Sequence, residues 1–404
     1  MSNTSQPRLL SFALDNWTVL GGRVVVSLTN GVAVLVGRNG AGKSAILEGF
    51  EAISSHAIGR LSRIRQNDEE SIPKILDIEI LTPNNRQLEY KYELIPLPTS
   101  IDDSDIDDST NDSSADSQFS WNDYCQYVDG DKEVLWKTET GVTTFNNGNE
   151  PVTILGNTSS LRRLHLSEKA RLKLPTEMQW VYAVLRGVRL LGKTPVRPTS
   201  KRSPSLIEVS SKGIYIRSGL TSNLARKILR LMESGELGEL ESVCQRIGLG
   251  RKLTIQKFVP SGESKEKIGG EDEEYIASVL LDGVNIGLLS DGTLRVLSIL
   301  IEIIFSYPSA TTIIEEPETQ IHPGLLAKLL NEIEAYTLGE NLVLSTHSPQ
   351  VVAWTSAEKI NLVYRNNEQT FVRKLGENEI QKVLRYLSEE GDLGEWIYSG
   401  ILDE

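Results

Sequence analysis

One eight-residue segment constrains the fold more than any other part of the 404-residue chain. It spans residues 37–44 and reads GRNGAGKS. The apolar, β-branched run 31–37 (GVAVLVG) precedes it, and a helical apolar pattern from Ala45 to Ile53 follows it. Small residues let backbone N–H groups surround an anion, and the helix points its positive end at the same place. Strand, glycine-rich turn and helix in this order predict a phosphate-binding loop in an α/β fold.

The residues of this loop have separate expected roles. Lys43 is placed to reach β- and γ-phosphate oxygens, and Ser44 is placed to bind Mg²⁺. The remaining nucleotide-binding positions are Arg38, Asn39, Gly40, Ala41 and Gly42. A strand–helix turn without a ligand is the alternative, but every fixed position of G-x-x-x-x-G-K-[ST] is matched. ATP and Mg²⁺ are therefore the expected ligands.

Two further strand ends carry groups suited to nucleotide chemistry. The β-branched run from Thr311 leads into Glu315 and Glu316. We expect Glu315 to help hold the metal and Glu316 to polarise the attacking water, although a solvated acidic turn has the same composition. The next strand, 341–347, ends at His347, which is placed to donate to a γ-phosphate oxygen. His322 is suited equally to a hydrogen bond that shapes its loop and to a subunit interface.

A second helix N-terminus offers another anion-binding surface. Ser290, Asp291 and Gly292 precede an apolar helical pattern within residues 287–303. Ser290 or Asp291 also suits an N-cap. One chain rarely needs two such surfaces for a single phosphate chain. Two chains arranged head to tail would use both, because each second helix would cap the nucleotide held by the partner.

Composition places the chain among globular proteins. Hydrophobic residues make up 39% and charged residues 24%, and no apolar run is long enough to span a membrane. The first residues lack the blocks of a signal peptide, and Cys125 and Cys244 give neither a disulfide framework nor metal-ligand spacing. We therefore expect a cytoplasmic protein.

The net charge of -13 argues against wholesale coating of nucleic acid. Residues 101–117 hold seven Asp and no Lys or Arg, so they are predicted to be a disordered acidic loop. The rest of the chain is less acidic, and a local basic groove stays open as an alternative. Candidates for its lining are Arg60, Arg63, Arg65, Arg162 and Arg163, although a solvated basic helix face is the favoured interpretation of each.

The combined motifs resemble the ATP-binding-cassette-type ATPase heads of the SMC, RecF and OLD group. The matching segments are residues 37–44, 289–295 (LSDGTLR), 313–323 (IIEEPETQIHP) and 344–350 (LSTHSPQ). The terminal segment 377–404 is similar to the terminal helices of these ATPases. More narrowly, the chain resembles stand-alone bacterial AAA family ATPases of anti-phage defence systems such as Septu, PARIS, Gabija and some retrons.

This resemblance implies an α/β P-loop NTPase of the ABC type, with a mixed sheet, flanking helices and a helical insertion lobe. The implied segments are 1–100 and 251–404 for the two parts of the ATPase domain and 101–150 for an acidic loop and insertion. Apolar residues at helical spacing within 222–235 and 235–248 predict helices that stop at Gly235 and Gly248, so 151–250 is expected to be the helical lobe. Apolar runs at 22–30, 74–83 and 86–97 predict further strands. The resemblance also implies that Glu316 is the catalytic glutamate, that His347 is the switch histidine, and that Ser290 and Gly292 contact the partner's γ-phosphate. Glu315 stands where transport-type cassettes usually have Asp, and Gln66 is the candidate Q-loop residue.

The function implied is an ATPase that forms a homodimer or higher oligomer and regulates a separate effector, such as a nuclease. The segment after His347 lacks the dispersed acidic set of OLD-type nucleases, so a nuclease is expected on another polypeptide. The alternative is a RecF-like repair ATPase that binds DNA across the dimer. A transporter subunit fits less well, because residues 289–295 depart from the transporter signature.

Overall fold

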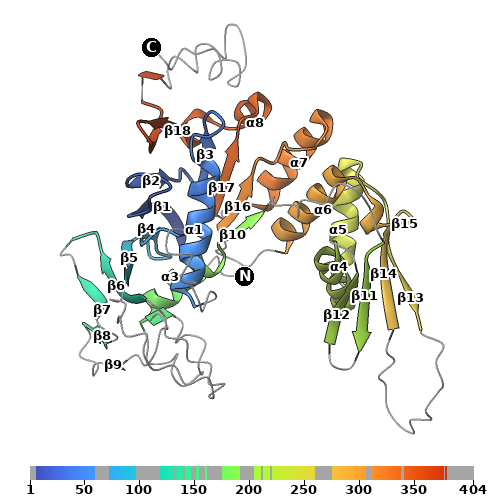
Figure 1. Ribbon diagram of the computed structural model, residues 1–404, viewed down its shortest axis with the longest axis horizontal. Coiled ribbons are helices and arrows are strands. Elements are labelled where there is room, and N and C mark those ends of the chain that lie inside the picture. The colour runs from blue at the N-terminus through green and yellow to red at the C-terminus, as the bar shows by residue number, and fades with distance from the viewer. Residues whose placement is uncertain are drawn as a thin grey trace, which may run out of the picture. The chain divides into compact units, whose positions relative to one another are not determined.

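The computed structural model describes most of the chain in two units (Figure 1). The first unit comprises Met1–Leu190, Tyr307–Glu315 and Gly339–Glu404, and the second comprises Leu191–Ser306 and Glu316–Leu338. The described residues are 6–59, 72–96, 119–130, 133–139, 142–146, 152–153, 160–161, 175–191, 204–210, 213–218, 221–259, 275–305, 311–337, 341–376 and 378–379.

A six-stranded sheet in the first unit carries the phosphate loop. Its order is β10-β16-β17-β3-β18-β19, where β16, β17, β3 and β18 are parallel and β19 is antiparallel to β18. The strands are β3 (Val32–Val36), β10 (Arg189–Leu191), β16 (Thr311–Glu315), β17 (Asn341–Thr346), β18 (Ile360–Asn366) and β19 (Gln369–Lys374). The apolar runs of β3, β16 and β17 are almost wholly buried, as is typical of central parallel strands. The predicted strands at 31–37, 311–316 and 341–347 are confirmed.

An eight-stranded sheet in the same unit has the order β2-β1-β4-β5-β6-β7-β8-β9, and its neighbouring strands are all antiparallel. Its strands are β1 (Arg8–Asp15), β2 (Val24–Ser27), β4 (Ile75–Leu81), β5 (Gln87–Pro96), β6 (Phe119–Tyr127), β7 (Val134–Glu139), β8 (Val142–Phe145) and β9 (Val152–Thr153). The predicted strands within 22–30, 74–83 and 86–97 are confirmed as β2, β4 and β5.

Helix α1 (Lys43–Ala57) contacts strands of both sheets (Figure 1). It buries Ile46, Phe50 and Ile53, and the ring of Phe50 stacks on that of Phe12 in β1 with centroids 3.9 Å apart. Helix α3 (Thr176–Arg186) packs against α1. The hydrophobic core of the unit therefore fixes the helix whose first turn belongs to the phosphate loop.

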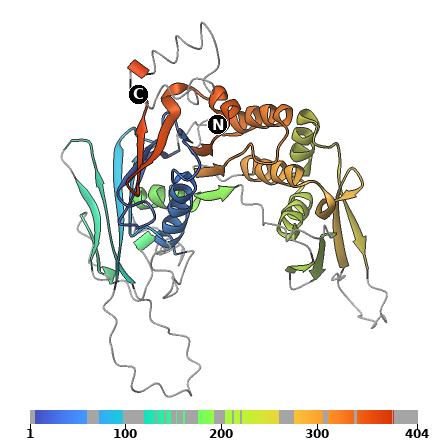
Figure 2. The ribbon, with the colours of Figure 1, turned by 45° about the horizontal axis from the view of Figure 1, so that its top comes forward.

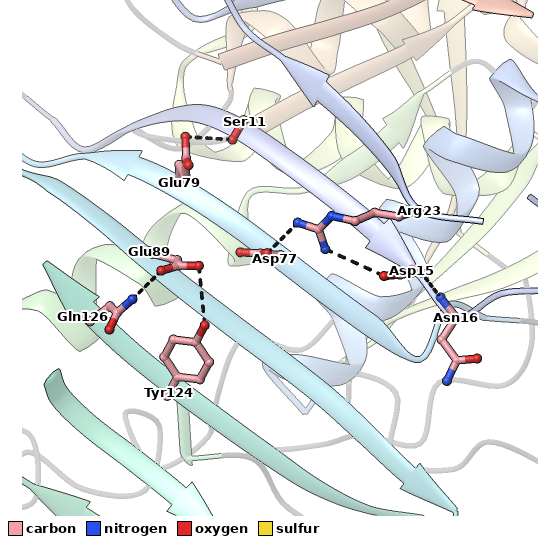
Figure 3. Close-up of polar contacts among 9 residues, drawn as sticks. All are labelled: Ser11, Asp15, Asn16, Arg23, Asp77, Glu79, Glu89, Tyr124 and Gln126. Atoms are coloured by element: carbon pink, nitrogen blue, oxygen red, sulfur yellow. Dashed lines mark hydrogen bonds and ion pairs between the residues drawn. The ribbon is translucent and has the colours of Figure 1, made fainter. Parts of the chain in front are cut away.

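Polar side chains of neighbouring strands contact one another on one face of the antiparallel sheet (Figure 3). Arg23 lies 2.7 Å from the Asp77 carboxylate and 3.9 Å from that of Asp15. The side-chain amide of Gln126 donates to Glu89 on the neighbouring strand at 2.5 Å. Because successive side chains of a strand point to opposite faces, these polar positions alternate with the buried apolar ones.

A buried polar group lies on the core side of this sheet. The Asp123 carboxylate accepts hydrogen bonds from the hydroxyls of Tyr90 and Ser160. Burial raises the pKa of Asp123 and also that of Tyr90.

A second buried polar group lies on α1. Burial and the charge of Lys74 lower the pKa of His56 to about 4, and its ring nitrogen lies 2.7 Å from the hydroxyl of Tyr92. Hydrogen bonding between these groups offsets part of their desolvation.

The second unit combines a small sheet with a helical layer. Its strands pair in the order β12-β11-β14-β13, and β15 pairs with β14. The elements are β11 (Leu206–Ser210), β12 (Gly213–Ser218), α4 (Ser222–Ser234), α5 (Leu237–Ile247), β13 (Leu253–Phe258), β14 (Tyr275–Leu281), β15 (Val284–Asn285), η3 (Ile286–Leu288), α6 (Asp291–Ile304) and α7 (Pro323–Tyr336). Helix α4 packs on the sheet, and α5, α6 and α7 contact one another (Figure 2).

The helices of this unit follow the predicted apolar spacing. Helix α5 buries Leu240, Val243, Cys244 and Ile247, which recur at helical spacing on one side. Gly235 and Gly248 end α4 and α5 in the left-handed conformation, with φ of 78° and 80°. The predicted helices near 222–235 and 235–248 and their glycine stops are confirmed.

Several parts of the fold were not predicted. Residues 151–250 contain strands β9 to β12 besides the helices, and β1, β6 to β8, β13, β14, β18 and β19 were not predicted either. The acidic segment 101–117, Gln66, the five candidate groove arginines and nearly all of 377–404 lie outside the described residues. Among the described residues, no helix is long and apolar enough to cross a membrane.

Candidate nucleotide-binding site

Three neighbouring strand ends of the first unit carry the predicted groups. The parallel strands β16, β17 and β3 lie side by side, and they end at Glu315, just before His347, and just before the phosphate loop. Glu315 pairs with Ser345 of β17, which pairs in turn with Leu35 of β3. Adjacent strands are about 4.8 Å apart, so Glu315 lies only about 10 Å across the sheet from the end of β3. The fold thus brings three predicted elements to one edge.

The glycines of the loop have distinct reasons for being there. Gly42 has φ of 104°, and a Cβ there would lie 2.6 Å from the hydroxyl oxygen of Thr370. Gly40 has φ of 80° but would place a Cβ in open space. The carbonyl of Ala41 accepts a hydrogen bond from the same Thr370 hydroxyl at 3.2 Å. Thr370 of β19 therefore packs against the phosphate loop, and glycine at position 42 leaves room for this close contact.

Lys43 and Ser44 are the first two residues of α1. The Lys43 side chain is buried, and its Nζ donates to the carbonyls of Gly37 at 2.6 Å and Arg38 at 3.1 Å. Ser44, Arg38 and Asn39 are exposed. No side chain caps α1, and its first turn holds no acidic residue. The helix N-terminus therefore presents a positive dipole end, beside an ammonium group, to any anion in the loop.

Glu316 follows β16 directly and belongs to the second unit. Its backbone has φ of 42°, in the left-handed region that residues other than glycine rarely adopt. The Thr319 hydroxyl donates to its carboxylate at 3.3 Å, and the Thr319 N–H donates to its carbonyl at 3.0 Å. The side chain is half-buried, so its carboxylate is both held and accessible.

The turn that begins α6 has the geometry of an N-cap. The Ser290 hydroxyl accepts a hydrogen bond from the Thr293 N–H at 3.1 Å and lies 2.7 Å from the Thr293 hydroxyl. Ser290 is exposed, and Asp291 and Gly292 are partly exposed. The N-cap interpretation is therefore correct for Ser290. The cap leaves the exposed hydroxyl at a helix N-terminus, and the contact with a partner's nucleotide stays a prediction.

The two histidines differ in what they do locally. The His322 ring accepts a hydrogen bond from the Gly324 N–H at 3.1 Å and caps α7, so it shapes its own loop. His347 is exposed just after β17, before the short helix α8 (Pro349–Trp354). Its role toward phosphate stays a prediction.

Sequence reasoning missed two residues that support this site. Thr370 contacts the phosphate loop from β19, and Arg295 of α6 donates through Nη2 to the carbonyl of Glu316 at 2.8 Å. No local pattern marks Thr370. Arg295 does have a signal, because it is the one charged residue in the largely apolar run 294–301; in the structure it is only 4% exposed.

The donor set near the loop fits Mg²⁺. A serine hydroxyl and a carboxylate are the hard oxygen ligands that Mg²⁺ prefers, and it takes only one or two of them from protein when phosphates and water supply the rest. Ser44 is exposed in the first turn of α1, and Glu315 is half-buried at the end of β16. The described residues hold no cluster of three or more His, Cys, Asp or Glu side chains suited to a metal.

Residues 32–353 match the family model described as "AAA domain, putative AbiEii toxin, Type IV TA system". No curated protein matches the chain. The matched range contains the phosphate loop, both carboxylates, residues 289–295 and His347. The predicted α/β P-loop ATPase fold is thus confirmed.

Solved structures of SMC heads are also similar at low identity. An Smc head bound to the C-winged-helix domain of ScpA has 10% identity and a TM-score of 0.43, over 92% of this chain and 99% of that one. The Smc head with an extended coiled coil, bound to the C-terminal domain of ScpA and derived from Pyrococcus furiosus, has 13% identity and a TM-score of 0.42, over 95% and 100%. The SMC head of Thermotoga maritima has 10% identity and a TM-score of 0.37, over 91% and 99%.

Proposed function

Because the chain belongs to the family described as "AAA domain, putative AbiEii toxin, Type IV TA system", we propose that it binds ATP with Mg²⁺ and hydrolyses it. The observation that carries this proposal is the shared edge of three parallel strands, where the phosphate loop, Glu315 and the residue before His347 meet. Glu316 is the next residue in the chain after Glu315.

The roles follow from the position and chemistry of each group. Lys43 exchanges its carbonyl partners for β- and γ-phosphate oxygens, and the N–H groups at the start of α1 bind the same anion. Ser44 and Glu315 hold Mg²⁺, which when bound neutralises charge on the phosphates. Glu316 accepts a proton from the attacking water as that water adds to the γ-phosphorus, and the bond to the β-phosphate oxygen breaks to release ADP. His347 donates to a γ-phosphate oxygen.

We propose further that two chains close head to tail around ATP, so that Ser290, Asp291 and Gly292 of one chain cap the nucleotide of the other. The exposed, capped N-terminus of α6 supports this arrangement, because it offers a hydroxyl and a positive helix end as a second anion-binding surface besides the phosphate loop. Each site would then be composite, with the loop from one chain and the cap from the other.

A mixing experiment tests the composite site. Lys43→Ala and Ser290→Asp should each abolish ATP hydrolysis alone, and a mixture of the two should recover it, because a mixed dimer contains one intact site. Asp is as good an N-cap as Ser, so this change adds negative charge while α6 keeps its cap. Ser290→Asn is the neutral control and should impair turnover less. A mixture as inactive as its two folded components would contradict the head-to-tail dimer.

We also propose that this cytoplasmic ATPase regulates a separately encoded effector in a prokaryotic defence system. The family description names a putative toxin of a toxin–antitoxin system, and such systems have two components, which supports a partner. Phage plating on cells that carry the complete operon should fall with the wild-type chain and recover with Lys43→Ala. Equal plating, or efficient DNA cleavage by the purified chain that is lost on changing its own carboxylates, would argue against this role.

A further inference from the structure

The loop that carries Glu316 has an unusual backbone. Glu316 and Gln320 have φ of 42° and 64°, so two non-glycine residues within five positions adopt the left-handed conformation. Such residues are uncommon, and they persist where surrounding contacts hold them, often at functional sites. Something must therefore hold this loop in place.

Helix α6 supplies the contact at the first of these residues. Arg295 is 4% exposed, and its Nη2 donates to the carbonyl of Glu316 at 2.8 Å. The same carbonyl also accepts the Thr319 N–H at 3.0 Å. A buried guanidinium loses its hydration, so its charge-assisted bond to this carbonyl is strong and the orientation of the Glu316 peptide is well determined.

The same face of α6 touches the second left-handed residue. Gly292 lies three residues before Arg295, on the same side of the helix. A Cβ at Gly292 would lie 2.2 Å from the carbonyl oxygen of Gln320, so the helix backbone is in close contact with the loop. One helix face thus contacts the loop at both Glu316 and Gln320.

We infer that Arg295 is a positioning residue for Glu316, an inference that rests on the proposed hydrolysis of ATP. Arg295 acts through the Glu316 backbone and fixes the direction of the carboxylate. The N-cap of the same helix is Ser290, the proposed cap of the partner's nucleotide. The carboxylate of one site and the cap of the other are therefore joined within each chain by the first two turns of α6.

The inference predicts a loss of turnover without a loss of binding. Arg295→Met should lower kcat about 10- to 100-fold, because small misplacement of a catalytic group is costly. KM and ATP-driven dimerisation should change little, since Arg295 acts on the Glu316 backbone and not on the nucleotide. Arg295→Lys keeps the charge and a donor and should restore part of kcat. In a Glu316→Gln background, Arg295→Met should have almost no further effect, because both changes remove the same action.

Arg246→Met is the matched control. Arg246 joins α5 to α7 in the same unit by hydrogen bonds of 3.0 and 2.8 Å to the carboxylate of Glu332, a residue outside the Glu316 loop. If Arg295→Met and Arg246→Met lowered kcat equally, or if the effects of Arg295→Met and Glu316→Gln multiplied, Arg295 would be only a structural residue. If Arg295→Met does not fold, Arg295→Lys and its double variant with Glu316→Gln decide in the same way. A wild-type chain without ATP turnover would contradict the proposed function instead.

Discussion

Replacing Lys43 with alanine should remove measurable ATP binding and leave both units folded. The Lys43 ammonium is buried, and it already lies within the loop, 2.6 and 3.1 Å from two of its carbonyls. Each hydrogen bond from a charged group contributes about 1.5–3 kcal/mol. Loss of two such bonds to phosphate corresponds to a decrease in affinity of roughly 100-fold or more. Isothermal titration calorimetry with ATP and Mg²⁺ measures this directly.

Lys137→Ala provides the control for charge. Lys137 lies in β7 of the same unit, and its side chain is half exposed beside Glu139. Lys137→Ala loses the same charge in the eight-stranded sheet, whereas the phosphate loop follows a strand of the six-stranded sheet, so this variant should bind ATP as the wild-type chain does. Unchanged ATP affinity in Lys43→Ala would mean that the loop does not hold phosphate in the proposed way. Thermal unfolding of both variants separates lost binding from lost structure.

The elements around the phosphate loop could be predicted because their signals are local. β3, the loop and α1 are contiguous, and the apolar runs of β16 and β17 need no partner to be recognised as buried strands. The parallel order then follows from alternating strands and helices, which places the three strand ends at one edge. For this reason the strand ends at Glu315 and His347, and the loop that holds Lys43, could be predicted from the sequence alone, while the roles of these residues stay predictions.

The antiparallel sheet was harder to predict because its pattern depends on distant partners. In β6 the inward positions are Trp121, Asp123, Cys125 and Tyr127, so a carboxylate interrupts the apolar alternation. Asp123 is tolerated there because Tyr90 and Ser160, 33 and 37 residues away, donate to it. No local sequence pattern predicts such a hydrogen-bond network.

The contacts that support the site were also hard to predict, because they join residues far apart in the sequence. Thr370 reaches the carbonyl of Ala41 across 329 residues, and Arg295 reaches Glu316 across 21. In both bonds the acceptor is a backbone carbonyl, which every residue has, so the acceptor cannot be recognised from its residue type. Sequence patterns therefore identify residues that bind ligand more readily than residues that hold those ligand-binding residues in place.

Replacing Glu316 with glutamine should slow ATP hydrolysis by at least about 100-fold, which corresponds to roughly 3 kcal/mol of barrier, because an amide does not accept the proton of the attacking water. Glutamine has nearly the same shape, and its amide oxygen still suits the Thr319 hydroxyl, so the left-handed backbone is retained. ATP-driven dimers should therefore persist and accumulate, as measured by light scattering beside a phosphate-release assay. Glu318→Gln removes the same charge two residues along the loop and should stay within a few-fold of the wild-type rate. Turnover of Glu316→Gln within a few-fold of wild type, under about 1 kcal/mol of barrier, would assign the water-activating role to another group.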